Sequence, residues 1–274
     1  MTFIASLKAK KGIVQVSDSL ELQTGAISRF DDFKKLFDAK GIDEENQNEK
    51  LSAKEIWNTF KPERIKNIDG AKKTFQITEF SSIQISGSAL INGTEVKDII
   101  KQLTDITSIK RELTDQNIVD ELLSILYTYF PDREILEFED PSQKETFSDT
   151  SFIFYYYDKL VNEKHIHTLA YRKNALKQKY TYNDAYEGSK DWIYFSAGML
   201  GLSHNFYSLN HSNLLFRPPT FREGFQIMKS AIELAILTEK INYDIPGVGG
   251  TINYSVIDKN GFKFFRDELD LAEE

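Results

Sequence analysis

Hydrophobic and polar residues alternate almost from the first position of the chain. Phe3, Ala5 and Leu7 recur at every second position, which is the period of a half-buried strand. A polar turn, KAKKG, and a second alternating run, IVQVSD, follow, so the pattern predicts a β-hairpin over residues 2–18. Because most globular chains fray at their first residues, ordered sequence this close to the terminus indicates a constraint on the terminus itself.

From about residue 25 to residue 68 the hydrophobic spacing becomes helical. Aromatic and leucine residues between 30 and 37 recur at helical intervals. The sequence SAKE at 52–55 then offers a capping box for a second helix, which would end near Pro62. This part of the chain therefore predicts a helical insertion after the first hairpin.

The remaining pattern consists of blocks of strands separated by helices. KKTFQITEFSSIQISG predicts a second hairpin, and apolar stripes predict one helix from about residue 96 and another ending before Pro131. TSFIFYYYDK, HIHTLAY and DWIYFSAG predict strands, TFRE at 220–223 caps the clearest helix, and GTINYSVIDKNGFKFF predicts a closing hairpin. This order favours antiparallel sheets covered by helices, an α+β fold, and the length of the chain allows one large domain or two small ones.

Composition and charge exclude several classes of protein. The chain has 274 residues, 41% of them hydrophobic, and a net charge of −8, so nucleic acid and anionic membrane are poor partners. The absence of cysteine excludes disulfides, thiol catalysis and cysteine-ligated metals. Without a long apolar run or a basic leader, we expect a soluble, cytoplasmic protein that binds neither nucleic acid nor membrane.

Few motifs with known chemistry occur in the chain. His165 and His167 could hold a metal on one face of a strand, but no carboxylate motif accompanies them, so two polar positions on a half-exposed strand is the favoured interpretation. GVGG at 247–250 could bind a phosphate, although a tight connection between helix and strand is favoured. We therefore expect no cofactor and no metal.

Thr2 becomes a candidate nucleophile if Met1 is removed, as methionine aminopeptidase does before small residues. A free α-amine has a pKa near 7.7–8.0, so a useful fraction is unprotonated at neutral pH. That amine can act as the general base for the hydroxyl of its own residue. Such chemistry requires a terminus that is held rigidly in a sheet.

At this point the sequence resembles the β-type subunits of the proteasome, which are N-terminal nucleophile (Ntn) hydrolases. The resemblance lies in TFIASLKAKKGIVQVSDS, GAKKTFQITEFSSIQISG, SALINGTEVKDIIKQL and VGGTINYSVIDKNGFKFF, about half of the chain. Residues 105–190 agree only in the order of their elements. The resemblance implies a four-layer αββα sandwich of two antiparallel sheets covered by helices, in a single domain over residues 1–274 with an unusual inserted helical segment at about 25–68.

The resemblance also implies a site. Thr2 would be the nucleophile, Asp18 the catalytic acid, Lys73 the lysine that favours the alkoxide, and Gly87 the donor of the N–H that stabilises the oxyanion. The implied activity is that of a threonine peptidase that cleaves peptide bonds. The implied partners are peptide or protein substrates, further copies of the chain in a ring, and an ATP-dependent unfoldase.

The sequence also departs from the family pattern. Lys34 or Lys35 lies nearer to Asp18 in the chain than Lys73 does, but Lys73 is preferred because its segment continues into a strand. Ser196 and Asp244 are the candidates for the residues that usually support the amine.

Two functions are alternatives to a threonine peptidase. One is a non-proteolytic Ntn amidase or transpeptidase-type ligase, and the other is a catalytically silent member of a proteasome-like assembly. The insertion could gate a substrate cleft or face a partner.

Overall fold

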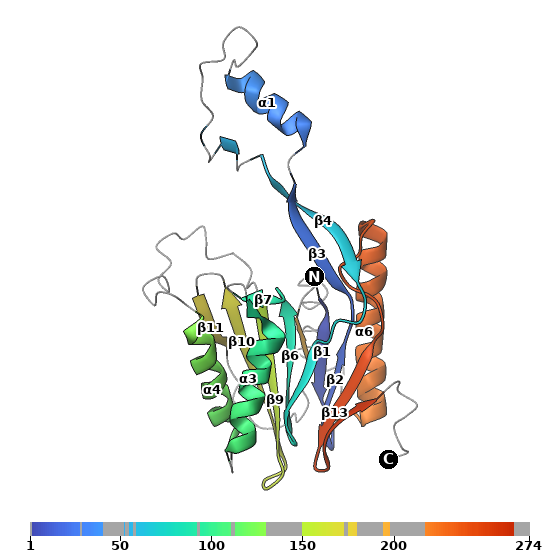
Figure 1. Ribbon diagram of the computed structural model, residues 1–274. Coiled ribbons are helices and arrows are strands. Elements are labelled where there is room, and N and C mark those ends of the chain that lie inside the picture. The colour runs from blue at the N-terminus through green and yellow to red at the C-terminus, as the bar shows by residue number, and fades with distance from the viewer. Residues whose placement is uncertain are drawn as a thin grey trace.

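The protein is described by a computed structural model of mixed α+β architecture, in which the main sheets are antiparallel (Figure 1). The structure describes residues 2–27, 29–40, 52, 55–56, 59–91, 94–110, 113–129, 150–172, 175–179, 194–197 and 217–265.

The first sheet has five strands in the order β12–β1–β2–β13–β14. Its centre is the predicted N-terminal hairpin, in which Ile4 lies opposite Ser17 and Lys8 opposite Ile13. The predicted closing hairpin lies beside it, so the two ends of the described chain share one sheet. The strands are β1 (Ile4–Lys8), β2 (Gly12–Ser17), β12 (Tyr194–Ala197), β13 (Asn253–Asp258) and β14 (Gly261–Phe265).

The second sheet has five strands in the order β11–β10–β9–β6–β5. It contains the predicted hairpin around residues 73–87 and the predicted strand pair around residues 150–171, together with β11, which the sequence pattern did not predict. The strands are β5 (Thr74–Thr78), β6 (Ser81–Gly87), β9 (Thr150–Asp158), β10 (Glu163–Arg172) and β11 (Ala175–Lys179), and a short pair, β7 (Leu90–Ile91) and β8 (Thr94–Glu95), follows β6.

Helices cover the outer faces of the two sheets. On the first sheet lies α6 (Phe221–Asn242), and on the second lie α3 (Val96–Ile109) and α4 (Asp115–Thr128) (Figure 1). The predicted capping box of α6 is present, because Thr220 and Glu223 each bond the other's backbone N–H. Within the described ranges, no helix is long and apolar enough to cross a membrane.

The strand β1 is more deeply buried than its alternating pattern predicts. Phe3, Ala5 and Leu7 pack against α6, whereas Ile4 on the opposite face packs between the sheets against Tyr155 of β9. The prediction of a half-buried strand was wrong, because this strand has a helix on one face and a second sheet on the other. The described layers thus run helix, sheet, sheet, helices.

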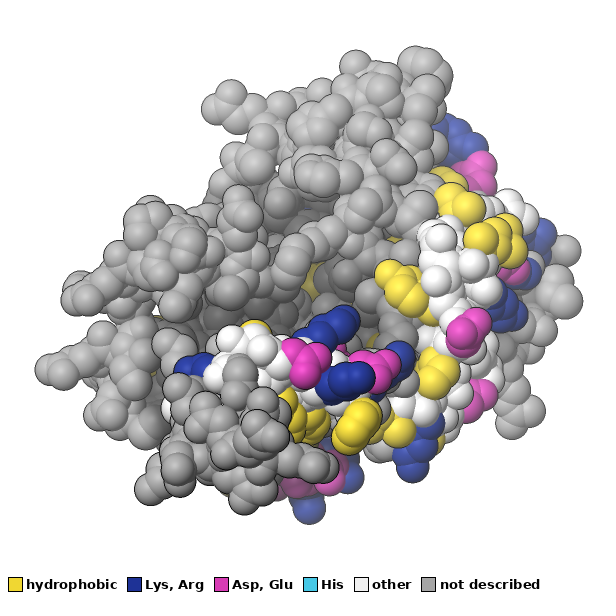
Figure 2. Space-filling model, turned by 90° about the horizontal axis from the view of Figure 1, so that it is seen from above, with side chains coloured by type: hydrophobic (Ala, Val, Ile, Leu, Met, Phe, Trp, Pro, Cys, Tyr) yellow, Lys and Arg dark blue, Asp and Glu magenta, His cyan; other side chains and the backbone are white. Residues whose placement is uncertain are grey.

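The described residues between 21 and 68 form an arm that leaves the body close to the N-terminus (Figure 1). Its stem is a two-stranded ribbon of β3 (Glu21–Ile27) and β4 (Lys61–Ile68), and its tip carries α1 (Phe30–Lys40). The predicted helix at 30–40 is confirmed, but the prediction of a helical segment over about 25–68 did not include the two ends, which pair as strands. In the view down onto this end of the molecule, charged side chains of both signs lie among hydrophobic ones (Figure 2).

The arm tip is expected to be dispensable for folding, because no residue of α1 is buried and no described residue between 28 and 60 belongs to the three hydrophobic clusters. Ile27 lies opposite Lys61, so an Asn-Gly turn can replace residues 28–60 and close the ribbon. Urea denaturation should show a change of less than about 1 kcal/mol in the free energy of unfolding. As a control, Phe225→Ala in the core should cost about 3–5 kcal/mol. A comparable loss on deleting the tip would contradict this prediction.

Candidate functional site

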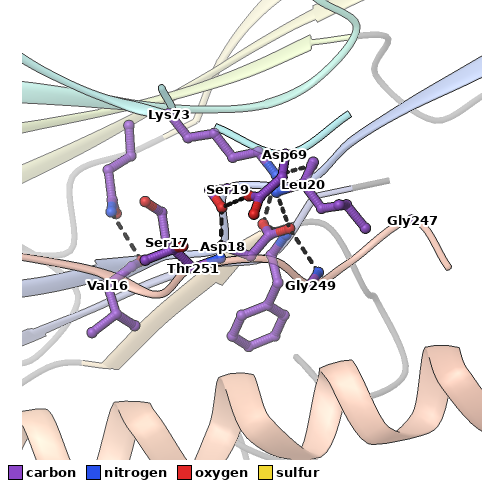
Figure 3. Close-up of polar contacts among 12 residues, drawn as sticks. Val16, Ser17, Asp18, Ser19, Leu20, Asp69, Lys73, Gly247, Gly249 and Thr251 are labelled. Atoms are coloured by element: carbon purple, nitrogen blue, oxygen red, sulfur yellow. Dashed lines mark hydrogen bonds and ion pairs between the residues drawn. The ribbon is translucent and has the colours of Figure 1, made fainter. Parts of the chain in front are cut away.

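Asp18 follows the last residue of β2 and is fully buried. Its Oδ1 accepts hydrogen bonds from the Phe3 backbone N–H at 2.9 Å and from Lys73 Nζ at 2.6 Å. Its Oδ2 accepts from the backbone N–H groups of Gly249 at 3.1 Å and Leu20 at 3.3 Å (Figure 3). A buried carboxylate is stable only when it is paired and hydrogen-bonded, and four donors meet that requirement here.

Lys73 immediately precedes β5 and is 5% exposed. Besides the bond to Asp18, its Nζ donates to the Leu20 carbonyl at 2.6 Å. Lys34 and Lys35, the rival candidates, lie exposed on α1 in the arm. The structure thus pairs Asp18 with the lysine that the sequence favoured.

Burial shifts the proton affinity of both partners. It raises the pKa of the Asp18 carboxyl above its ordinary value, with the Lys73 charge and the hydrogen bonds from Lys73, Phe3 and Gly249 opposing that shift. It also lowers the pKa of the Lys73 ammonium, with the Asp18 charge opposing. Because the pair is enclosed, each charge depends on the other for compensation.

Thr2 is 6% exposed, and the residue that follows it in the chain is bonded to Asp18. The next residue, Phe3, donates its N–H to Asp18 Oδ1, and its carbonyl accepts from the Asp18 N–H at 3.2 Å. The N–H and the carbonyl of Phe3 are therefore both bound to Asp18. These two bonds fix the backbone of the residue that follows Thr2. The structure brings Thr2, Asp18 and Lys73 to one end of the sheet interface.

Gly87 ends β6 and is exposed, with a φ of +101° that a side chain would strain. The Ile85 N–H bonds the Lys73 carbonyl at 2.9 Å, and Gly87 lies two residues further along the same strand. This register sets Gly87 at the end of the second sheet where Lys73 enters it.

The two supporting candidates have different positions. Ser196 lies in β12 with its backbone opposite Ala5 of β1, the strand that follows Thr2. Asp244 is exposed in the connection between α6 and β13. Among the described residues of that connection, Gly249 and not Asp244 is hydrogen-bonded to Asp18.

The contacts that the connection after α6 makes with the site are the main feature that sequence reasoning missed. Ser19 bonds the Asp69 carboxylate and accepts from the Thr251 N–H at 2.7 Å (Figure 3). Gly250 has a φ of +73°, and a Cβ there would lie 2.5 Å from Ser19 Oγ. The tight connection that GVGG favoured is confirmed, and the adjacent glycines are the signal that could have located it.

A cleft of about 520 Å³ opens beside Lys73. Thr2 is not one of its lining residues. Its lining residues include hydroxyl side chains, charged residues of both signs and one aromatic residue: Ser17, Ser19, Asp69, Gly70, Ala71, Lys72, Lys73, Thr74, Thr251, Asn253 and Phe264.

The described histidines lie elsewhere in the fold. His165 and His167 are on β10, where both contact Asp115 at the start of α4. Within the described ranges, these three residues form the one group whose ligand atoms could hold a metal ion.

The sequence matches no protein-family model and no curated protein.

The Asp18–Lys73 pair should behave as one unit in stability measurements. Asp18→Asn or Lys73→Met alone leaves its partner's charge buried and unpaired, so each should lower the free energy of unfolding by about 3–5 kcal/mol. The double variant should lose clearly less than the sum of the two, as measured by urea denaturation. Lys72→Met is the matched control: this exposed lysine lies over the Phe75 and Phe264 rings and should cost about 1 kcal/mol or less. Additive losses would show that the two groups are not coupled.

Proposed function

We propose that the protein is a threonine-type Ntn hydrolase, with Thr2 as nucleophile after removal of Met1. The observation that supports this most strongly is that one buried oxygen, Asp18 Oδ1, binds both Lys73 Nζ and the amide that follows Thr2. A terminus that is held in place suits a nucleophile whose base is its own α-amine, and the buried lysine beside it is the group that the resemblance to proteasome β-type subunits implies.

The first step is attack of Thr2 Oγ on the carbonyl carbon of an amide bond, while the hydroxyl proton passes to the Thr2 α-amine. Lys73 stabilises the developing alkoxide, and Asp18 holds Lys73 in its charged form. The Gly87 N–H is the proposed donor to the tetrahedral oxyanion. When the C–N bond breaks, the leaving amine takes the proton from the α-amine and an ester to Thr2 remains.

The second step is hydrolysis of that ester. The α-amine, again unprotonated, takes a proton from a water molecule, which attacks the ester carbonyl. The acid product leaves, and the proton returns to Thr2 Oγ. Each turnover thus consumes one amide bond and one water, and the chain's own groups carry every proton transfer.

The resemblance to proteasome β-type subunits supports three further proposals. The substrates are peptides or proteins, copies of the chain assemble into a ring, and an ATP-dependent unfoldase delivers substrates to that ring. The position of the arm is relevant to these proposals. Its helix α1 lies at the end of the ribbon that is far from the sheets (Figure 1). Phe30 is 81% exposed there. A surface of this kind suits contact with a partner better than cover for the site.

Intact mass spectrometry tests the nucleophile. The purified chain should lack Met1 and should gain one equivalent of a peptide epoxyketone, which reacts with both the hydroxyl and the amine of an N-terminal threonine. Thr2→Ser should still be labelled, Lys73→Met should be labelled at least about 10²-fold more slowly, and Lys72→Met should resemble the parent. The circular dichroism of each variant shows whether it is folded. A retained Met1, or labelling that persists in Thr2→Ala, would refute the proposal.

The pH dependence of peptide hydrolysis should be bell-shaped. The rate should rise as the α-amine loses its proton, at about pH 7.7–8.0 for an ordinary amine. It should fall once Lys73 loses its charge, and because burial lowers the pKa of Lys73 this fall should begin below the ordinary lysine value of about 10.4. Initial rates between about pH 6 and pH 11 measure both limbs. Arginine stays charged to higher pH than lysine, so in Lys73→Arg the fall in any remaining activity should move to higher pH. If the fall stays at the same pH, it belongs to a group other than Lys73.

A further inference from the structure

Three side chains able to bind a metal meet between the second sheet and its covering helices. Asp115 is the first residue of α4, whereas His165 and His167 occupy alternate positions of β10 and so point to the same face. His167 lies opposite Phe154, which belongs to the hydrophobic cluster under α3 and α4. Asp115, His165 and His167 therefore lie on the helix-covered face of the second sheet. The Asp18–Lys73 pair lies on its other face, at the interface between the two sheets.

We propose that Asp115, His165 and His167 form a binding site for a divalent transition metal ion of the zinc class. Asp115 Oδ2 lies 2.7 Å from His167 Nε2 and 3.1 Å from His165 Nδ1. One ligand atom from each residue lies within 4.8 Å of the others. Tetrahedral zinc with bonds of about 2.0–2.1 Å holds its ligands about 3.3 Å apart, so small side-chain rotations make this set a first coordination sphere.

The surroundings of His165 fit metal binding. Its Nδ1 faces Asp115, while its other ring nitrogen, Nε2, lies 3.5 Å from Glu163 Oε2. Metal-bound histidines commonly donate their second N–H to a carboxylate, which fixes the tautomer and turns the other nitrogen toward the ion. Glu163 is in position to do this for His165.

Burial divides the site into an anchored side and an open side. The His167 side chain is 4% exposed, whereas those of His165 and Asp115 are 21% and 20% exposed. Water can therefore reach the ion and complete a shell of three protein ligands, and histidine with carboxylate suits zinc or cobalt better than calcium or magnesium. The ion would fasten the start of α4 to β10, so its binding would stabilise the fold.

The site revises the expectation that the chain holds no metal. The HIH sequence already supplied two ligands on one strand face, but no carboxylate motif accompanies them in the sequence. Asp115 precedes His165 by 50 residues, and only the packing of α4 on the sheet brings the two together.

Titration of the chelator-treated full chain with Co²⁺ and Zn²⁺ tests the site. Co²⁺ should give a saturable visible absorption at one equivalent, Zn²⁺ should displace it, and Zn²⁺ should raise the melting temperature. Asp115→Asn and His165→Gln, both at partly exposed positions, should weaken Zn²⁺ binding at least about tenfold in calorimetry. Asp120→Asn removes the same charge from the exposed side of α4 and should bind like the parent.

Two results would overturn the proposal. One is the absence of saturable Co²⁺ or Zn²⁺ binding to the parent chain. The other is binding that Asp115→Asn and His165→Gln leave unchanged, which would assign the ion to other residues. If these variants lower the melting temperature while the parent binds no metal, the cluster is an ionic clamp between α4 and β10. Circular dichroism shows whether each variant is folded.

Discussion

The buried ion pair between Asp18 and Lys73 is the interaction on which the arrangement of the site depends. Asp18 directly follows a strand of the first sheet and Lys73 directly precedes a strand of the second, so the pair joins the sheets across their interface. Neither charge can be left alone at this depth without a cost of several kcal/mol. The backbone around it is shaped accordingly: Leu20 bonds both partners, Gly249 approaches from the far end of the chain, and Phe3 ties the N-terminus to the same carboxylate.

A layer of polar side chains between the sheets keeps the two partners in register. Gln15 of the first sheet donates to Ser82 of the second at 2.8 Å, and Gln84 of the second donates to the Val16 carbonyl at 3.0 Å. Tyr155 in turn donates to Gln84 at 2.8 Å. Apolar contacts alone would tolerate sliding of one sheet over the other, but a slip would leave these buried groups unpaired. The polar layer thus sets where Lys73 lies relative to Asp18.

The sequence predicted those parts of the structure whose causes are local. Alternation and turn residues located the hairpins, and TFRE located the start of α6, because a strand period or a capping box is contained within a few residues. Lys73 was favoured over Lys34 and Lys35 on the same basis, since its segment continues into a strand. What escaped prediction depends on distant pairing: β3 with β4 across the arm tip, the two covered faces of β1, and Gly249, which binds Asp18 from 231 residues away. The adjacent glycines at 247–250 indicate a tight connection, but no individual segment shows which distant residue it contacts.

Two carboxylates, those of Asp18 and Asp115, each join separate elements of the fold. Asp18 is more deeply buried than Asp115, and this difference in burial gives the two groups different roles. Asp18 is fully enclosed, so its partners must be built into the chain, and the result is a fixed terminus beside a fixed lysine. Asp115 is one-fifth exposed and faces two imidazoles, whose neutral forms present lone pairs. Solvent access allows a dissolved cation to enter between such groups, whereas the Asp18 site already contains its cation as Lys73. The same kind of side chain therefore serves permanent order at the interface between the sheets and exchangeable binding under the helices.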